Sequence, residues 1–454
     1  MNNNWGKLHV TFVTNFCNEL SKSNIRYFIL RNYENLPENN NGKDVDVVIE
    51  PSKYREVKEL LLQTMKDLGI HYYTITQFDR MRCWYIMDLG QEFSIHIDII
   101  ENEVYKGFEF FKFDDLYTHT VKYKDFVVLD KTADTIMLIV QNLVAYKNLK
   151  PKYRNTIQNN YNLNVKEIDK ALLIFFGENV GNEVIAFLKK NDFDSIVGIA
   201  HKLERTVMKR IFKQRPFYTI KNIIRFLIGK FYRIIWCPHK FWRFFAVVAP
   251  DGTGKTTFIN NLIASLSFYY VSDPVRFQIH HFRPTILPNL GAIGERTGVM
   301  KQDTNFTNPH RARSAGTLSS FFRMLYYWLD YVIGMPYLLR KEVQYERYTI
   351  FDRYIYDFLV DPRRSRIDLP YWVRKIFTKL VLQPQIVFVL DADTEVIYNR
   401  KQELTKKEIN RQLILFRSLS TSGKRFVRLD ANKSPDEITN QAIKTIFEFF
   451  LIKV

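Results

Sequence analysis

The chain has 454 residues, 46% of them apolar, and a net charge of +18. This length exceeds what one hydrophobic core usually organises, so two or three domains are expected, and the apolar content excludes a disordered polymer. Three widely spaced cysteines support neither a disulfide framework nor a zinc site and favour a reducing compartment. The amino-terminus lacks a secretory pattern, and no apolar stretch is long enough to span a bilayer. We therefore expect a cytoplasmic protein, with peripheral membrane binding left open.

Helical and strand patterns alternate in the first domain that we predict, residues 1–125. A 3.6-residue apolar period predicts a helix over residues 8–22, and apolar runs predict strands over residues 27–30, 45–49 and 93–100. This mixture is typical of an α/β or α+β domain.

Three acids in this domain are candidates for a metal site. Asp44 and Asp46 stand two residues apart at a strand, so their side chains point to one face, and Asp98 lies in a second strand. Carboxylates that converge from neighbouring strands can bind two Mg²⁺ ions for in-line attack on a nucleotide α-phosphate. The alternative is a pair of ordinary acids at a strand edge. His96, on the same strand face as Asp98, is either a structural histidine or a hydrogen-bond partner of that carboxylate.

Residues 27–49 read YFILRNYENLPENNNGKDVDVVI, in which LRNYENLP precedes the strand that carries the first two acids. Through these features the first domain resembles the minimal nucleotidyltransferase fold. That family usually has a glycine followed by glycine or serine before the acids, whereas Arg31 and Asn32 occupy that region here. Either Gly42 supplies a compensating turn, or catalysis is weakened and the domain only binds.

Two segments separate this domain from the carboxy-terminal half. Long 3.6-residue periods with few strand signals predict a helical domain over residues 126–213. Residues 214–243 form a basic aromatic linker, and between His201 and Arg243 the chain has twelve Lys or Arg residues and a single acid. We expect an amphipathic helix there, bound to an anionic membrane surface or packed between domains. Because no nucleic-acid module is recognised, specific nucleic-acid binding is not expected.

Five apolar strand segments alternate with helical stretches in residues 244–454. This alternation predicts an α/β fold in which a parallel sheet has helices on both faces. The strand segments cover residues 244–248, 275–279, 348–351, 386–390 and 426–429.

The first of these strands leads into the sequence APDGTGKTT and then into a helix. Strand, tight turn and helix are the context that a phosphate-binding loop requires. Gly252 and Gly254 let backbone N–H groups turn toward the phosphates. Lys255 adds a positive charge and Thr256 a hydroxyl for Mg²⁺, while the helix that begins near Lys255 adds its dipole. Ala249 stands where the general pattern has its first glycine.

An acid and an arginine, Asp352 and Arg353, end the predicted strand at residues 348–351. Beside a phosphate-binding loop, such an acid can hold Mg²⁺ or accept the proton of an acceptor. The arginine can bridge phosphates with two hydrogen bonds. Taken alone, the pair would more often be a local ion pair, and only its partnership with the loop favours function.

Five motifs follow one another in this half: APDGTGKTT, HFRP at 281–284, FDRY at 351–354, VLDADTEV at 389–396 and RLDANKSPDEI at 428–438. In this order they resemble the thymidylate kinase branch of P-loop nucleotide kinases. The resemblance implies ATP and Mg²⁺ as cofactors, with Arg283 and Arg353 orienting phosphates and Asp251 reaching an acceptor hydroxyl. The basic run Arg400, Lys401, Lys406, Lys407 and Arg411 falls at the family's mobile lid, although a solvated helix face is an equal alternative.

The resemblance thus implies a set of site residues. Catalysis is expected from Lys255, Asp352, Arg353 and Arg283. ATP is expected to contact Asp251, Gly252, Thr253, Gly254, Lys255, Thr256, Thr257, Ala431 and Asn432, with the last two beside the adenine. Metal ligands are expected to be Thr256 and Asp352 in this half and Asp44, Asp46 and Asp98 in the first domain.

The departures from that family lie on the acceptor side. After FDRY the chain lacks the serine and the Ala-Tyr-Gln stretch of the family, and it carries an aromatic insertion, SSFFRMLYYWLDYVIG, before FDRY. We therefore expect an acceptor other than dTMP. An arginine triplet either binds an anionic acceptor or forms a solvated turn: Arg363, Arg364 and Arg366. Four aromatic residues are expected in the core or a domain interface, with stacking on a base or sugar as the alternative: Tyr326, Tyr327, Trp328 and Tyr331.

The sequence therefore predicts an ATP-dependent kinase that acts on a small nucleotide, sugar or polyol. Coupling to the amino-terminal nucleotidyltransferase would suit the supply of activated precursors for cell-surface polysaccharide. The alternatives are a regulatory protein that binds nucleotide without turnover, and a nucleotidyltransferase with a P-loop switch. A small-molecule acceptor is the main partner that we expect, and a homodimer is left open.

Overall fold

The computed structural model describes residues 5–40, 44–78, 80–270, 276–288, 316–421 and 423–454. The chain forms two compact units. The first comprises residues 1–229, 269–271 and 451–454, and the second comprises residues 230–268 and 272–450. The division after residue 229 falls inside the segment 214–243 that we predict to be a linker.

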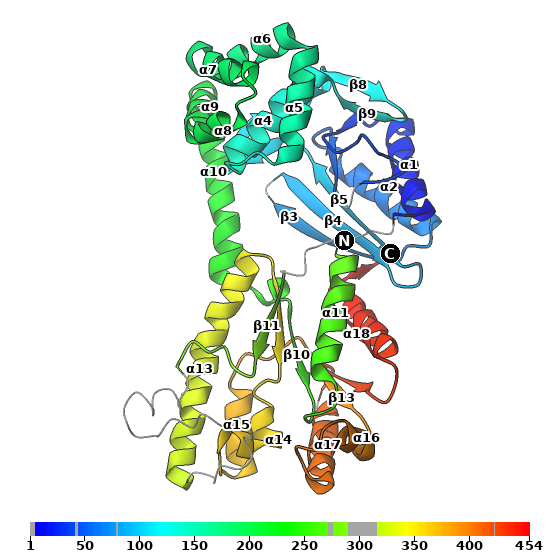
Figure 1. Cartoon of the computed structure of the whole chain (residues 1–454), viewed down its shortest axis with the longest axis vertical. Coiled ribbons are helices and arrows are strands. Elements are labelled where there is room, and N and C mark those ends of the chain that lie inside the picture. Colours follow the sequence, from blue (N-terminus) through cyan, green and yellow to red (C-terminus); the bar gives the residue numbers. More distant parts are fainter. Residues whose placement is uncertain (1–4, 41–43, 79, 271–275, 289–315, 422) are drawn as a thin grey trace. The chain divides into compact units, whose positions relative to one another are not determined.

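The first unit contains a mixed eight-stranded sheet (Figure 1). The strand order is β15-β3-β4-β5-β2-β1-β9-β8, in which β2 pairs with β5 and β1 with β9 in parallel, and the other neighbours are antiparallel. The strands are β1 Tyr27–Ile29, β2 Val45–Ile49, β3 Tyr72–Phe78, β4 Met81–Asp88, β5 Phe93–Ile100, β8 Thr120–Tyr123, β9 Phe126–Leu129 and β15 Ile452–Lys453. A separate hairpin joins β6 Glu103–Tyr105 to β7 Phe108–Phe111.

Helices α1 (Lys7–Lys22) and α2 (Tyr54–Asp67) cover one face of this sheet. Odd-numbered apolar residues of β2 and β5, such as Val47 and Ile97, are buried in the same core as these helices. Because side chains alternate along a strand, the even-numbered acids Asp46 and Asp98 lie on the opposite face. The period of two thus places these acids on the face opposite the main core, where Val48 and Ile100 belong to a second hydrophobic cluster.

The rest of the first unit is mainly helical. Residues from α4 to α9 share one hydrophobic core, in agreement with the 3.6-residue apolar period of this region. The elements are α3 Phe113–Tyr117, α4 Lys131–Ile139, η1 Val140–Ala145, α5 Pro151–Leu163, α6 Val165–Phe176, α7 Glu178–Lys189, α8 Phe193–Gly198, α9 Ala200–Gln214 and α10 Pro216–Lys230.

The second unit contains a parallel five-stranded sheet in the order β11-β12-β10-β13-β14. Its strands are β10 Phe244–Val248, β11 Phe277–His281, β12 Tyr348–Asp352, β13 Ile386–Asp391 and β14 Phe426–Asp430. Its helical elements are η2 Phe231–Trp236, η3 His239–Phe241, α11 Lys255–Tyr269, α13 Thr317–Gln344, α14 Asp357–Val360, η6 Pro362–Ser365, α15 Tyr371–Lys379, α16 Thr394–Arg400, α17 Lys406–Ser420 and α18 Pro435–Phe450.

Helices pack against both faces of this parallel sheet. Phe244 of β10 shares a core with Tyr331 of α13, whereas Phe388 of β13 packs its ring 5.8 Å from that of Phe258 in α11. The prediction of an α/β chain with a parallel sheet is therefore confirmed. Within the described ranges, no helix is long and apolar enough to cross a membrane.

The sequence-based elements differ from the structure in several places. The predicted helical domain, residues 126–213, begins with β9, which belongs to the eight-stranded sheet. The antiparallel strands β3 and β4 were not predicted, because β4 reads MRCWYIMD and lacks a clear alternation of apolar and polar residues. Strand β11 begins at Phe277 and continues to His281, since its backbone pairs with β12 as far as Asp352 regardless of side-chain polarity. Val275, the predicted start of this strand, lies outside the described residues.

Candidate active sites

The loop between β10 and α11 has the backbone of a phosphate cradle. Gly252 and Gly254 have φ values of +85° and +95°, which favour glycine. A Cβ atom at Gly252 would also lie 3.0 Å from the Cβ of Lys401 and 3.2 Å from the carbonyl oxygen of Ile397. Ala249 is fully buried, and its φ is not positive. The methyl group at the first position is thus compatible with this loop.

Lys255 is held at the start of α11. Its Nζ donates hydrogen bonds to the carbonyl oxygens of Ala249 (3.1 Å) and Pro250 (2.9 Å). Burial, reinforced by the charge of Arg353, lowers the pKa of Lys255 to about 8. An anionic ligand beside this amine would stabilise its charged form.

Asp251 is surrounded by three cations. It forms ion pairs with Arg353 and with Arg364, whose Nη1 lies 2.7 Å from Oδ2, and Lys255 lies 3.6 Å away. Burial alone would raise the pKa of Asp251, but the charges of Arg353, Lys255 and Arg364 hold it well below its usual value. Asp251 is therefore an ionised acceptor of hydrogen bonds and a weak base.

The carboxyl end of β12 places Asp352 and Arg353 beside the loop. Arg353 adopts a left-handed backbone (φ 71°), and its guanidinium pairs with Asp251 and Asp357. The ion pairs of Arg353 thus include a residue of the loop. Asp352 Oδ2 lies 3.3 Å from Nδ1 of His281, while Oδ1 has no hydrogen-bond partner among the described residues. A buried carboxylate oxygen without a partner fits a ligand of Mg²⁺ or of its water.

Arg283 follows β11 and is oriented by α13. Its Nη1 lies 2.9 Å from Oδ2 of the fully buried Asp330, and its guanidinium carbon lies 5.0 Å from the ring centre of Tyr327. Asp330 also accepts backbone N–H groups from Thr285 and Leu287 at 3.2 and 2.8 Å. The aromatic helix therefore fixes both Arg283 and the turn after β11.

A cleft of about 740 Å³ brings these groups together. The loop glycines, Thr256, Thr257 and Asp352 line it, and Tyr327 forms part of its wall. Its acids are Asp251 and Asp352, whereas six of its lining residues are cations: Lys255, Arg283, Arg353, Arg364, Arg400 and Lys401. This excess of positive charge, next to a glycine-rich loop and a helix amino-terminus, is suited to polyphosphate.

Other predicted residues lie outside this cleft. The Thr253 hydroxyl donates to the carbonyl oxygen of Pro250 (2.8 Å) and supports the turn. Ala431 and Asn432 follow β14. The backbone N–H of Ala431 donates to the carbonyl oxygen of Asp391 at the end of β13, and Oδ1 of Asn432 accepts from the backbone N–H of Asp393. Because the carboxyl ends of parallel strands share one edge of the sheet, they lie on the same edge as the loop.

The other aromatic and basic residues singled out in the sequence also lie mostly outside the cleft. Tyr331 and Trp328 pack in the core of the second unit. Tyr326 donates a hydrogen bond to the carbonyl oxygen of Pro288 (2.7 Å). Lys406 pairs with Glu395 and Arg411 with Glu408, and Lys407 is exposed. Arg363 is exposed and Arg366 half-buried, so only Arg364 of the triplet lines the cleft.

The three predicted carboxylates of the first unit lie together. One oxygen each of Asp44, Asp46 and Asp98 falls within 4.8 Å of the others, and Asp46 stands directly opposite Asp98 in the β2–β5 pair. Burial raises the pKa of Asp46 to about 7, and the charge of Arg31 opposes this rise. The donor set fits divalent cations, which would neutralise the crowded carboxylates.

Arg31 forms an ion pair with Asp46 and donates to Oε1 of Gln141 at 2.9 Å. A cation therefore contacts the acids at the position where the resemblance leads one to expect a small residue. Asn32 has a positive φ of 56°, and its Oδ1 accepts a hydrogen bond from Lys152 at 2.9 Å. Gly42, the predicted compensating turn, lies outside the described residues.

Several groups near the two sites escaped the sequence interpretation. An acid within a largely apolar segment could have indicated Asp330. Asp357 stands four residues after Arg353, a spacing at which oppositely charged side chains can pair on a helix. Cys83 lies opposite Asp98 in the β4–β5 pair. The sequence did not indicate this neighbour, because strand β4 was not predicted.

No protein-family model matches the chain, and no curated protein matches it. A solved thymidylate kinase from Ehrlichia chaffeensis is similar at 17% sequence identity, over 45% of this chain and 97% of its own length, with a TM-score of 0.30. Similarity at this level does not assign a function.

Proposed function

We propose that the second unit transfers the γ-phosphoryl group of ATP to a small-molecule acceptor with the help of Mg²⁺. The observation that carries this proposal is the single cleft in which the glycine loop, Lys255 and Asp352 meet four arginines. Charge that develops on a transferring phosphoryl group is stabilised by such preorganised donors.

The chain's own residues supply positioning and charge. Backbone N–H groups of the loop and the ammonium of Lys255 bind the donor phosphates, and Thr256 and Asp352 would hold Mg²⁺, which neutralises phosphate charge. An acceptor oxygen attacks the γ-phosphorus while the bond to the β–γ bridging oxygen breaks, which releases ADP. Asp251 accepts a hydrogen bond from the acceptor and orients it, since its lowered pKa makes it a weak base.

The acceptor side favours a small molecule that already carries negative charge. Arg283 and Arg364 reach the cleft from β11 and η6, away from the loop in sequence, and Tyr327 offers an apolar ring beside Arg283. A phosphorylated nucleotide or sugar matches two guanidinium groups better than a neutral polyol does. The departures in sequence after FDRY argue against dTMP.

The test is a screen of phosphorylatable metabolites with ADP release as the readout. Lys255→Ala should abolish product formation with the best acceptor and leave the fold intact. Lys444→Ala, at an exposed position of α18 outside the cleft, should retain activity. ATP binding without ADP release for any acceptor would instead support the rival function, a nucleotide-binding regulator.

A second candidate function belongs to the first unit. The convergence of Asp44, Asp46 and Asp98 favours metal-assisted nucleotidyl transfer, in which an acceptor oxygen attacks the α-phosphorus and pyrophosphate leaves. Radiolabel from α-labelled ATP should then enter product, and Asp46→Asn should remove this label without affecting γ-label transfer. Label transfer from the γ-position alone would leave the kinase as the only activity.

A further inference from the structure

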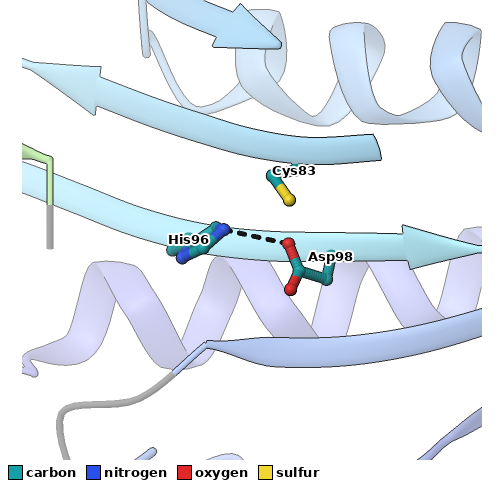
Figure 2. A group of neighbouring side chains, drawn as sticks. All are labelled: Cys83, His96 and Asp98. Atoms are coloured by element: carbon teal, nitrogen blue, oxygen red, sulfur yellow. Dashed lines mark ion pairs between the residues drawn. The ribbon is translucent and has the colours of Figure 1, made fainter. Parts of the chain in front are cut away.

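A thiol and an imidazole lie beside the carboxylates of the first unit. Cys83 on β4 stands directly opposite Asp98 on β5, and His96 lies two residues before Asp98 on the same strand face. One potential ligand atom of each of the three residues lies within 4.8 Å of the other two. Figure 2 shows the three side chains gathered between neighbouring strands.

Within this group, His96 contacts Asp98 directly. Nε2 of His96 and Oδ1 of Asp98 lie 2.9 Å apart, and both side chains are largely buried. Donor atoms that share one tetrahedral ion lie roughly 3 Å apart, because each bond to nitrogen or oxygen is about 2 Å long. The 2.9 Å separation of Nε2 and Oδ1 therefore fits coordination of one ion by both atoms.

The surroundings hold this group in place. The ring of His96 stacks on Tyr85 with centres 4.2 Å apart, which restricts its rotation. Cys83 and Asp98 belong to the interior of the eight-stranded sheet, where cross-strand pairing fixes their backbones. Preorganised ligands on rigid strands are a better basis for a metal site than side chains on loops.

We propose that Cys83, His96 and Asp98 bind a divalent transition-metal ion of borderline softness, with zinc as the best match. Thiolate and imidazole ligands select zinc and disfavour magnesium, which requires oxygen ligands. On binding, the thiol proton of Cys83 is released to solvent and a sulfur–metal bond forms. A water or a carboxylate such as Asp46, opposite Asp98 on β2, completes the coordination.

This site does not require either proposed activity, but it competes with the nucleotidyl transfer proposed for the first unit. Asp98 belongs both to this group and to the three carboxylates. A zinc ion bound here would therefore use a carboxylate that could otherwise bind magnesium. The cysteine spacing in the sequence gave no support for a zinc site. A site with one cysteine follows only from the strand register.

Cobalt provides the test, because a cobalt–thiolate bond gives a charge-transfer band in the near ultraviolet. The full-length protein, titrated with Co²⁺ in excess Mg²⁺, should show this band with one ion per chain, and Zn²⁺ should remove it. Cys83→Ser should lose the band. Cys237→Ser, a matched change in the second unit, should keep it. His96→Asn should weaken Co²⁺ binding by roughly tenfold or more.

The wild-type measurement decides the matter even where a variant folds poorly. Absence of the band in the wild-type protein, or its persistence in folded Cys83→Ser, overturns the proposal. Circular dichroism of each variant separates loss of a ligand from loss of the fold, and His96→Asn retains the thiol as an independent check.

Discussion

Lys255 shows how one buried residue sets the pH response of the cleft. Its pKa is lowered to about 8 by burial and by Arg353, whereas bound triphosphate would stabilise the ammonium and raise this pKa. Binding of ATP above about pH 8 should therefore take up a proton, and ATP affinity should fall as pH rises through this value. Calorimetry in buffers of different ionisation enthalpy measures the uptake.

The control for this prediction is Lys255→Arg, because a guanidinium remains charged throughout this range. Its ATP affinity, although weaker, should lack the pH step. An unchanged wild-type affinity across one pH unit on either side of the lowered pKa would show that the amine does not contact the nucleotide.

The buried pair of Arg283 and Asp330 gives a second prediction at this scale. Removing Asp330 takes this ion pair from the buried guanidinium of Arg283 and an acceptor from two backbone N–H groups. Asp330→Leu should therefore destabilise the protein by about 3–5 kcal/mol, as measured by urea unfolding. The double variant with Arg283→Met should recover part of that loss, since no buried charge then remains. Equal losses in the single and double variants would show that the two residues are not coupled.

The sequence predicted contacts between residues that are close along the chain or lie on predicted strands. It did not predict contacts between distant segments. The spacing of Asp44 and Asp46 fixed a common face, and their approach to Asp98 was predicted from strand patterns. Arg364 lies 2.7 Å from Asp251 although 113 positions separate them, and no pattern in either segment indicates this contact. Long-range pairs of this kind arise from the crossovers of the parallel sheet.

At the scale of elements, strand existence was predictable where burial was complete. Strands β10, β12 and β13 are buried, largely apolar runs, as expected for a parallel sheet covered on both faces. The edge strand β14 is only partly buried, and its apolar residues were enough to indicate it. Strand β4 pairs with its neighbours over its whole length, yet its sequence mixes Arg82, Cys83 and aromatic residues without a period. The candidate zinc site depends on that strand, which explains why it could not be predicted from the sequence.

Helix α10 carries an apolar stripe together with basic residues. Phe217, Ile220, Ile224 and Leu227 recur at helical spacing and are 86%, 43%, 51% and 55% exposed. Lys221 lies within the same turns, and the helix contains no acid. Such a helix binds an anionic lipid surface by inserting its apolar face while its cations remain near the headgroups.

We expect the full-length protein to co-sediment with vesicles that contain phosphatidylserine, and less so at high salt. Ile224→Glu should reduce this binding strongly, whereas Ile174→Glu, at an exposed position of α6, should not. Vesicles of neutral lipid should bind little. Failure to bind anionic vesicles at low salt would remove the membrane surface as a partner of this helix.

At the scale of the whole molecule, the chain combines two candidate chemistries that use separate residues. The cleft of the second unit and the carboxylates of the first share no side chain. Single substitutions can therefore inactivate one activity without the other, which makes their coupling testable in the full-length protein.

If the product of phosphoryl transfer is the acceptor for nucleotidyl transfer, two inactive variants should complement each other. Lys255→Ala cannot make the phosphorylated product, and Asp46→Asn cannot use it, so neither alone should form the nucleotidylated compound. Their mixture should form it, because a small product diffuses from one chain to the other, at a rate that rises with protein concentration. Chromatography of α-labelled products measures this. Supplying the phosphorylated product directly should restore Lys255→Ala, and a wild-type chain that leaves this product unlabelled would show that the two activities act on separate substrates.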